Sequence, residues 1–571
     1  MTTTRIEAHT VAEAFLAMLA DRGADYLFAN AGTDFPPIIE ALSALAAGGR
    51  KAPVPITVPH ENLAVAMAHG HTMISGRPQA VMVHVNVGTA NAICGVLNAA
   101  RIGMPMLLAA GRTPLTEAGL PGSRNRYIHW AQEMFDQAGM LREAVKWDYE
   151  LRRPEQVETV LDRAFDIATA EPKGPVYLTL PREVLAEPHP GLERRERAGP
   201  AVVAPHPDPR ALAAAARLLA RAERPLVITA DLGRNPAAVE VLAVLAERFA
   251  LPVVSFMARY VCLPSDHPMH VGAMPGPLLA EADLVLVVDC DVPWIASTGE
   301  PSAAAKIVHL GIDPLFQRYP IRGFAADLAI SGDAEAGLRA LDEELRRRQG
   351  EMSAAIESRR RRIAELRRDL ADGAARRLES AAGEVPLNYA WVSHCIDQVK
   401  DDDTIVVNEL ALAAEHVNFA KPGTFFAPSP AGGLGWGLGA ALGAKLAAPD
   451  RLVIAAVGDG SYMFGNPTPA HFVSQANQLP ILFVVFNNAG WSAVLKATQD
   501  MYPKGHAMRS NQPPLTRLSP SPGFERVVEA SGGYGERVDR PEALRPALER
   551  ALKVVREEKR QALLNVICRP R

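Results

Sequence analysis

Cysteine, unbalanced charge and long apolar runs are all scarce in this 571-residue sequence, and each scarcity excludes a class of protein. The five cysteines are scattered and form no C-x-x-C pair, and an odd, sparse count is typical of buried thiols in a reducing compartment rather than of a disulfide framework. A formal net charge of -4 provides no electrostatic attraction to nucleic acid or to an anionic membrane. No apolar run approaches the roughly 20 residues of a membrane span, and acidic residues interrupt the N-terminal helical pattern, unlike a signal peptide. We therefore expect a cytoplasmic protein.

What the sequence does contain is a regular alternation of short apolar runs with Ala/Leu-rich helical stretches. Runs rich in Val, Ile and Leu occupy residues 79–87, 105–111, 174–180, 224–230, 282–289, 404–409 and 451–457. Continuous apolar strands between helices are typical of parallel sheets that are covered on both faces. The predicted fold class is α/β, with doubly wound parallel sheets.

Two breaks divide the chain into three such units. Residues 186–209 are rich in proline and charge and are predicted to be a linker, and residues 344–373 form an arginine-rich helical connector. Acidic residues interleave the arginines, so the connector is interpreted as a solvated helix rather than a binding patch. The predicted domains are residues 1–185, 200–345 and 375–571.

Two apolar strands of the third domain end in polar oxygen atoms. Gly458-Asp459-Gly460-Ser461 closes one strand, and Asn488 and Gly490 follow the next. Ligands of open α/β sheets bind outside the carboxyl ends of strands, and glycines allow close approach of a phosphate. Each motif alone could be an ordinary turn. Together they predict a site for Mg²⁺, which prefers carboxylate, amide, carbonyl and phosphate oxygens, with Asp459, Asn488 and the Gly490 carbonyl as ligands of an ion that carries a diphosphate.

At these residues the chain resembles the thiamine diphosphate enzymes of the acetolactate synthase, pyruvate decarboxylase and benzoylformate decarboxylase group. The resemblance covers nearly the whole chain and rests on G-D-G followed by N-N, here with 26 residues between them (461–486). It implies pyrimidine-binding, central and diphosphate-binding domains, with thiamine diphosphate and Mg²⁺ as cofactors. Gly458, Gly460, Ser461 and Asn488 would bind the cofactor.

The resemblance places the cofactor-activating glutamate of the family at Glu61. A carboxyl at the start of an Ala/Met/Leu-rich helix can share a proton with a ring nitrogen, although an acid in a first helical turn also stabilises the helix dipole. Leu434 matches the bulky residue that bends the cofactor, although a glycine-rich helix start alone would look similar. One departure is that Leu410, Ala411 and Leu412 replace hydroxyl residues that contact the diphosphate in relatives.

Alternation over residues 80–92 predicts that His84 and Asn86 share one strand face at the strand end. His84 falls on a histidine that transfers protons in benzoylformate decarboxylase, although it could be a satisfied structural histidine. Asn86 is predicted to bind substrate. His71 is a second candidate for proton transfer, with a polar helix residue as the alternative. Thr33 matches a substrate-contacting serine, and Trp491 is expected to help cover the active site.

The resemblance implies a lyase that decarboxylates a 2-keto acid. Alternatives are a carboligase like acetolactate synthase, which joins the same fragment to a second carbonyl compound, and a non-catalytic relative. No glycine-rich phosphate fingerprint occurs in residues 228–243, so flavin (FAD) is not expected in the central domain. Since Glu61 and Asp459 belong to domains that meet between chains in the family, at least a homodimer is expected, and a homotetramer is common among relatives.

Overall fold

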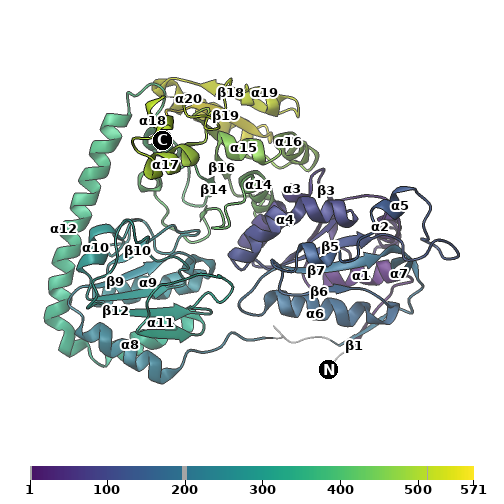
Figure 1. Ribbon diagram of the computed structural model, residues 1–571, viewed down its shortest axis with the longest axis horizontal. Helices are drawn as coiled ribbons and strands as arrows, with labels where there is room; N and C mark the ends of the chain where they lie inside the picture. Colours follow the sequence, from purple (N-terminus) through teal and green to yellow (C-terminus); the bar gives the residue numbers. More distant parts are fainter. Residues whose placement is uncertain (1–2, 196–201, 511, 571) are drawn as a thin grey trace.

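The computed structural model describes residues 3–195, 202–510 and 512–570. Three parallel sheets dominate it, each with helices on both faces (Figure 1). Their strand orders are β3-β2-β4-β5-β7-β6, β10-β9-β11-β12-β13 and β15-β14-β16-β17-β19-β18. The predicted α/β architecture with doubly wound parallel sheets is confirmed.

The first sheet belongs to the N-terminal part of the chain. Its strands are β2 (Tyr26–Asn30), β3 (Val54–Thr57), β4 (Gln79–Val83), β5 (Met106–Arg112), β6 (Asp148–Glu150) and β7 (Val176–Pro181). The helices are α1 (Val11–Asp21), α2 (Pro36–Ala47), α3 (Glu61–Ser75), α4 (Val85–Arg101), α5 (Ile128–Ala131), α6 (Val157–Thr169) and α7 (Arg182–Ala186). All five residues of β4 are buried, as expected for a strand that is covered on both faces.

The middle domain repeats the pattern with five strands. These are β9 (Pro225–Thr229), β10 (Val253–Ser255), β11 (Leu284–Val288), β12 (Lys306–Gly311) and β13 (Leu328–Ser331), with helices α8 (Pro209–Arg221), α9 (Pro236–Phe249), α10 (Gly276–Glu281) and α11 (Ala334–Arg346). The arginine-rich connector is the helix α12 (Gln349–Ala381), which runs along the side of the molecule from the middle domain to the C-terminal domain (Figure 1). Part of the expected linker is instead strand β8 (Leu192–Arg195), which pairs antiparallel with β1 (Thr3–Ile6).

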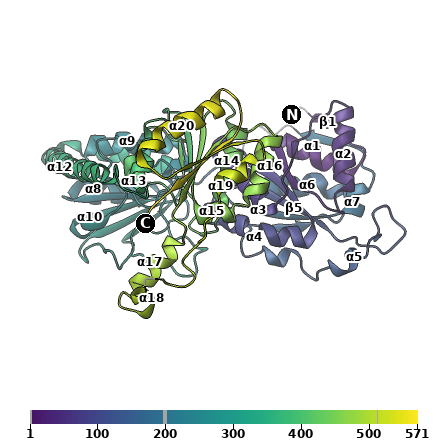
Figure 2. The ribbon, with the colours of Figure 1, turned by 90° about the horizontal axis from the view of Figure 1, so that it is seen from above.

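The C-terminal sheet carries the two strand ends of interest. Its strands are β14 (Ile405–Glu409), β15 (Phe425–Phe426), β16 (Val453–Gly458), β17 (Leu482–Asn487), β18 (Tyr534–Val538) and β19 (Ala562–Ile567). The helices are α13 (Tyr389–Asp397), α14 (Trp436–Ala447), α15 (Asp459–Phe464), α16 (Pro467–Ala476), α17 (Ser492–Met501), α18 (His506–Arg509), α19 (Phe524–Glu529) and α20 (Pro541–Arg556). Figure 2 shows α17 and α18 extending away from the rest of this domain, and neither helix has a buried residue.

Helices α3 and α14 join the first and third domains at a close crossing. Glycines on both helices permit it: a Cβ added at Gly70 would lie 2.0 Å from the Ala440 carbonyl oxygen, and one added at Gly443 would lie 1.9 Å from the Met67 carbonyl oxygen. Any side chain at these positions would push the helices apart. The crossing therefore sets the position of α3, which begins at Glu61, relative to the C-terminal sheet.

Candidate functional site

The two predicted strand ends are neighbours in the C-terminal sheet. β16 pairs in parallel with β17, so that Gly458 lies opposite Phe486. Asp459 begins α15 directly after β16, and Asn488 follows β17. The backbone N–H of Gly490 donates a hydrogen bond of 3.2 Å to Asp459 Oδ2. The structure thus brings together the three residues that the sequence predicts as metal ligands.

The oxygen atoms of Asp459 and Asn488 are available to bind a cation. Asp459 is 3% exposed, and burial raises the pKa of its carboxyl group. No salt bridge of the described residues includes it. The amide nitrogen of Asn488 donates to Tyr389 and Ser492, whereas its buried Oδ1 has no hydrogen-bond partner. A carboxylate without a counter-charge and a fixed, unpaired amide oxygen suit a hard divalent cation.

The donor set at this site contains one carboxylate only. Among the described residues, no group of three or more His, Cys, Asp or Glu side chains could hold a metal ion. A cation at Asp459 would therefore complete its coordination with amide, carbonyl, water or phosphate oxygens, as Mg²⁺ does when it bridges a phosphate.

The glycines around Asp459 serve different purposes. A Cβ added at Gly460 would lie 2.2 Å from a ring carbon of Trp491, so this glycine makes room for the tryptophan. Trp491 also packs edge-on against Phe464, with ring centroids 5.8 Å apart. Beside Gly458, the nearest atom to an added Cβ is the Ser461 hydroxyl at 4.0 Å. Gly458 thus leaves the space that close approach of a phosphate requires.

Glu409, at the end of β14, is a site residue that the sequence reasoning missed. It is fully buried and accepts hydrogen bonds from the backbone N–H groups of Gly435 (2.7 Å) and Gly437 (2.6 Å). Burial raises its pKa to about 7. Ser461 hydrogen-bonds to the same carboxyl group, and half-buried Leu434 lies on the loop that the carboxyl group holds. The available signal was an acidic residue ending an apolar strand, the same signal that identified Asp459.

Glu61 is the first residue of α3 and is 7% exposed. Asn91 Nδ2 donates a hydrogen bond of 3.1 Å to Glu61 Oε2. No hydrogen bond or ion pair of the described residues joins Glu61 to Asp459 or Asn488. Within one chain, the two predicted halves of the cofactor site are therefore not in direct polar contact.

The strand expected to carry both His84 and Asn86 ends earlier than predicted, and this expectation is wrong. β4 ends at Val83, His84 caps α4, and Asn86 lies in the first turn of α4. The prediction failed because the chain turns into α4 at Val85, and because in a strand buried on both faces the alternation of residue types marks no polar face. Val85 turns the chain with φ 31°, and Asp34 Oδ2 accepts its backbone N–H. Asn86 is half-buried, and its side-chain oxygen has no hydrogen-bond partner.

Thr33 and His84 lie at the carboxyl ends of the neighbouring strands β2 and β4. His84 Nδ1 lies 2.5 Å from Asp34 Oδ1, and the Thr33 hydroxyl lies 3.4 Å from His129 Nε2. Thr33, Asp34, His129 and Gln132 line a narrow hollow in the first domain, and His84 contacts two of them, Asp34 and Gln132. The two candidates are thus brought together.

His71 lies elsewhere. It is 2% exposed near the C-terminal end of α3, where it contacts Ser75, Asp25 and the ring of Tyr26. Burial lowers its pKa to about 4. Ten residues of α helix, about 15 Å, separate it from Glu61. This placement favours a packing role over the predicted proton transfer.

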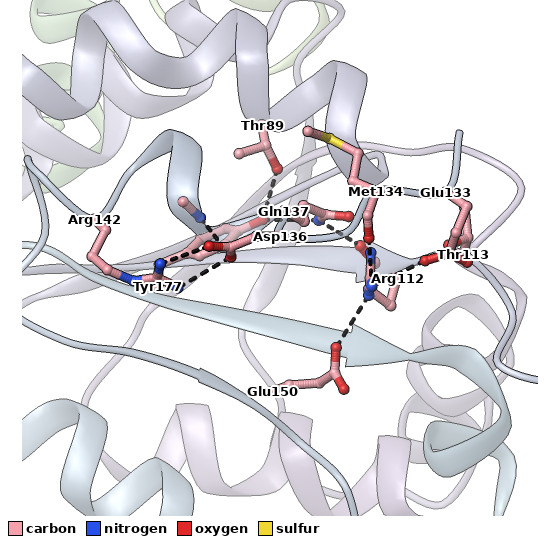
Figure 3. A network of polar contacts seen from close by, with 12 residues as sticks. Thr89, Arg112, Thr113, Glu133, Met134, Asp136, Gln137, Arg142, Glu150 and Tyr177 are labelled. Atoms are coloured by element: carbon pink, nitrogen blue, oxygen red, sulfur yellow. Dashed lines mark hydrogen bonds and ion pairs between the residues drawn. The ribbon is translucent and has the colours of Figure 1, made fainter. Parts of the chain in front are cut away.

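The segment between β5 and β6 contributes His129 and Gln132 to the lining of the hollow, and Arg112 anchors the segment (Figure 3). Arg112 donates to Glu150 Oε2 (3.1 Å) and to the Met134 carbonyl oxygen (2.9 Å). Gln137 donates to the Gly111 carbonyl oxygen (3.0 Å). These bonds tie the segment that carries His129 and Gln132 to the end of β5.

A larger cavity of 290 Å³ lies between the first and middle domains. Asp231, Asp289 and Asp313, which follow the carboxyl ends of β9, β11 and β12, form part of its wall together with Arg234. Burial raises the pKa of Asp289 to about 7.

Comparison with known proteins identifies the family. Three profiles match: the N-terminal TPP-binding domain of thiamine pyrophosphate enzymes at residues 9–140, their central domain at 212–341 and their C-terminal TPP-binding domain at 409–566. Benzoylformate decarboxylase of Pseudomonas aeruginosa is 30% identical over 76% of this chain and 79% of its own length. The chain belongs to the thiamine pyrophosphate enzyme family. It is therefore an enzyme of a family of decarboxylases and carboligases, and the predicted resemblance is confirmed.

Further relatives of this thiamine pyrophosphate enzyme include carboligases and transferases. Sulfoacetaldehyde acetyltransferase of Alcaligenes xylosoxydans xylosoxydans is 26% identical over 98% of this chain and 93% of its own length. Acetolactate synthase isozyme 3 large subunit of Escherichia coli is 26% identical over 96% of this chain and 93% of its own length. The crystal structure of benzoylformate decarboxylase from Polynucleobacter necessarius has a TM-score of 0.79 at 21% identity, covering 99% of both chains. That likeness confirms the fold.

No helix among the described residues has the length and apolar character needed to cross a bilayer. All five cysteines are free.

Proposed function

We propose that this thiamine pyrophosphate enzyme is a lyase that decarboxylates a 2-keto acid, in the manner of benzoylformate decarboxylase. The observation that supports it most strongly is the pair of adjacent strand ends, with the buried carboxylate of Asp459 and the unpaired amide oxygen of Asn488. Such oxygens suit Mg²⁺ with a bound diphosphate. His84 is paired with Asp34, whose carboxyl group lines the narrow hollow of the first domain, and this pair supports a proton-transferring decarboxylase.

Each residue would have a distinct role. Asp459, Asn488 and the Gly490 carbonyl would hold Mg²⁺, with Gly458 allowing the diphosphate to approach. Leu434 would support the bent cofactor from the loop that Glu409 holds, and Glu61 would share a proton with its aminopyrimidine ring. When bound, thiamine diphosphate would supply a carbon nucleophile for the substrate carbonyl and a cationic ring that accepts the electron pair left as carbon dioxide departs.

A carboligase is the second candidate. Acetolactate synthase and sulfoacetaldehyde acetyltransferase relatives align over 96% and 98% of the chain, compared with 76% for the decarboxylase of Pseudomonas aeruginosa. The two activities differ in what reacts with the fragment that remains after carbon dioxide leaves. A decarboxylase adds a proton to this fragment, whereas a carboligase joins it to a second carbonyl compound.

The active site is proposed to need a second copy of the chain. Glu61 has no polar contact with Asp459 or Asn488 among the described residues, and a partner's first domain could supply that glutamate. We propose at least a homodimer, with a homotetramer as the full assembly. Flavin is not part of the proposal, because residues 228–243 contain no glycine-rich phosphate fingerprint.

The deciding experiment measures carbon dioxide and products from pyruvate, 2-ketobutyrate, benzoylformate and oxalyl-CoA, with thiamine diphosphate and Mg²⁺, with and without an aldehyde acceptor. Glu61→Gln should lower turnover by about 10²-fold or more. Glu335→Gln is a matched control, because Glu335 also lies in a first helical turn and accepts an asparagine side chain, Asn235, at 2.9 Å. It should retain wild-type release.

The products choose between the two candidates. An aldehyde as sole product supports the decarboxylase, and an acyloin or acetohydroxy acid supports the carboligase. If bound cofactor releases carbon dioxide from none of the acids, the 2-keto acid assignment fails, and diketone or acyloin cleavage becomes the reaction to test.

A further inference from the structure

His84 and Asp34 form a pair that the surrounding backbone is shaped to accommodate. A Cβ added at Gly32 would lie 2.1 Å from His84 Nδ1, and one added at Gly111 would lie 1.8 Å from Asp34 Oδ2. Asp34 is 3% exposed, and the side chain of His84 is 18% exposed. Glycine at positions 32 and 111 thus leaves the space that the pair occupies. An ordinary surface contact would not require the absence of a side chain at either position.

Both oxygens of Asp34 are used as acceptors. Oδ1 lies 2.5 Å from His84 Nδ1, and Oδ2 accepts the backbone N–H of Val85 at 3.2 Å. An ionised carboxylate can only accept hydrogen bonds, so Nδ1 of His84 must carry the proton. In the neutral ring, Nε2 is then the atom with the free lone pair.

The partner of Nε2 agrees with this assignment. The amide nitrogen of Gln132 lies 3.2 Å from His84 Nε2 and can donate to it, whereas the buried Oε1 of Gln132 has no partner. A half-turn of the amide would present Oε1 to a protonated Nε2. Gln132 can therefore pair with the neutral ring and with the imidazolium.

We propose that Asp34 is a positioning residue: it holds His84 in the Nδ1-protonated tautomer, so that Nε2 is the atom that exchanges a proton with the substrate. Gln132 occupies Nε2 until a substrate hydroxyl group, which can donate to the same lone pair, displaces it. When Nε2 accepts a proton, the imidazolium charge is balanced by Asp34, and the same proton leaves from Nε2 to the substrate or to water. The inference rests on the proposed function for its catalytic consequence and on geometry alone for the tautomer.

Asp34→Asn separates these two parts. Asparagine has one acceptor oxygen for two donors, so if its oxygen keeps Val85 N–H, its NH₂ group faces Nδ1 and forces the proton to Nε2. Turnover by the holoenzyme should then fall by about 10²-fold or more, with cofactor affinity unchanged. Asp283→Asn is the control, because both carboxyl oxygens of Asp283 are also used as acceptors, here by the backbone N–H groups of Glu223 and Arg224 in the middle domain. It should leave turnover within about twofold of wild type.

The tautomer is read by ¹⁵N spectra of the full-length protein labelled at histidine, with the His84 signals identified by their loss in His84→Gln. We expect protonated Nδ1 in wild type and protonated Nε2 in Asp34→Asn. Gln132→Leu removes the other partner and should keep the wild-type tautomer, which preserves the test if Asp34→Asn does not fold. Protonated Nε2 in wild type, or a changed tautomer in Gln132→Leu, would overturn the inference, as would undiminished turnover of Asp34→Asn.

The spectra need neither substrate nor cofactor. If the 2-keto acid assignment fails while the tautomer changes as expected, only the proposed function is lost. If turnover is found and the tautomer does not change, only the role of Asp34 is lost.

Discussion

Gly443→Ala tests whether the crossing of α3 and α14 sets the geometry of the cofactor site. The added Cβ would lie 1.9 Å from the Met67 carbonyl oxygen and 2.8 Å from the backbone nitrogen of His71. Both are backbone atoms of α3, which cannot move without moving the helix. Real Cβ atoms essentially never approach a neighbour within 3.0 Å, so the helices must separate by at least the difference between 3.0 and 1.9 Å, which is 1.1 Å.

Two opposing terms set the change in unfolding free energy. Overpacking of this kind costs about 3 kcal/mol at the upper end of its usual range. Alanine is favoured over glycine in a helix by about 1 kcal/mol, so the net destabilisation should be about 2 kcal/mol. Because a misplacement of about 1 Å can cost 10²-fold in rate, turnover should fall by about that factor.

The assay compares the urea midpoint and turnover of Gly443→Ala with those of Gly373→Ala. Gly373 lies in the connector α12, where the nearest atom to an added Cβ is the flexible tip of Arg377 at 3.4 Å. That control should gain about 0.5–1 kcal/mol and keep its activity. If the two variants behave alike, α3 and α14 are not in the proposed tight contact, and the reasoning is refuted.

Two further predictions concern charge in the C-terminal domain. Burial raises the pKa of Glu409 from 4.5 to about 7, so its contribution to stability is complete below pH 4.5 and is lost as the pH rises to about 7. The loss is about 3 kcal/mol. Unfolding of the apoprotein between pH 5 and 7 should therefore depend less on pH in Glu409→Ala, and an unchanged slope would contradict the assigned burial effect. Mg²⁺ with thiamine diphosphate should stabilise wild type by about 2.7 kcal/mol at a hundredfold excess over the dissociation constant. Chelation by EDTA should abolish this gain, and Asp459→Asn should lack it, as measured by thermal unfolding. A full gain in Asp459→Asn would exclude that carboxylate as a ligand.

Features that depend on a short stretch of chain were predictable. Seven apolar runs marked strands of the parallel sheets, because burial on both faces leaves a continuous apolar signature. The oxygen-bearing residues Asp459 and Asn488 were found from their position directly after such strands. Glu61 was correctly placed at the start of a buried helix, since the Ala/Met/Leu composition that follows it is itself local.

The apolar pattern gave one wrong prediction, where a strand face for His84 and Asn86 was inferred from alternating residue types. Residues 80–87 alternate in the sequence, but β4 is buried on both faces and ends at Val83, so the alternation carried no information about His84 and Asn86. Asp34 and His84 are 50 residues apart, and only the parallel pairing of β2 with β4 makes them neighbours.

Sequence by itself thus determined the fold class, the family resemblance and the oxygen atoms at two strand ends, because each depends on residues that are adjacent in the chain. Tertiary structure alone decided that Glu409 holds the loop of Leu434, that His71 packs against Asp25 and Tyr26, and that His84 has a carboxylate partner. These outcomes depend on contacts between strand ends and helix faces that are far apart in the sequence. The composition of a single segment therefore cannot predict them.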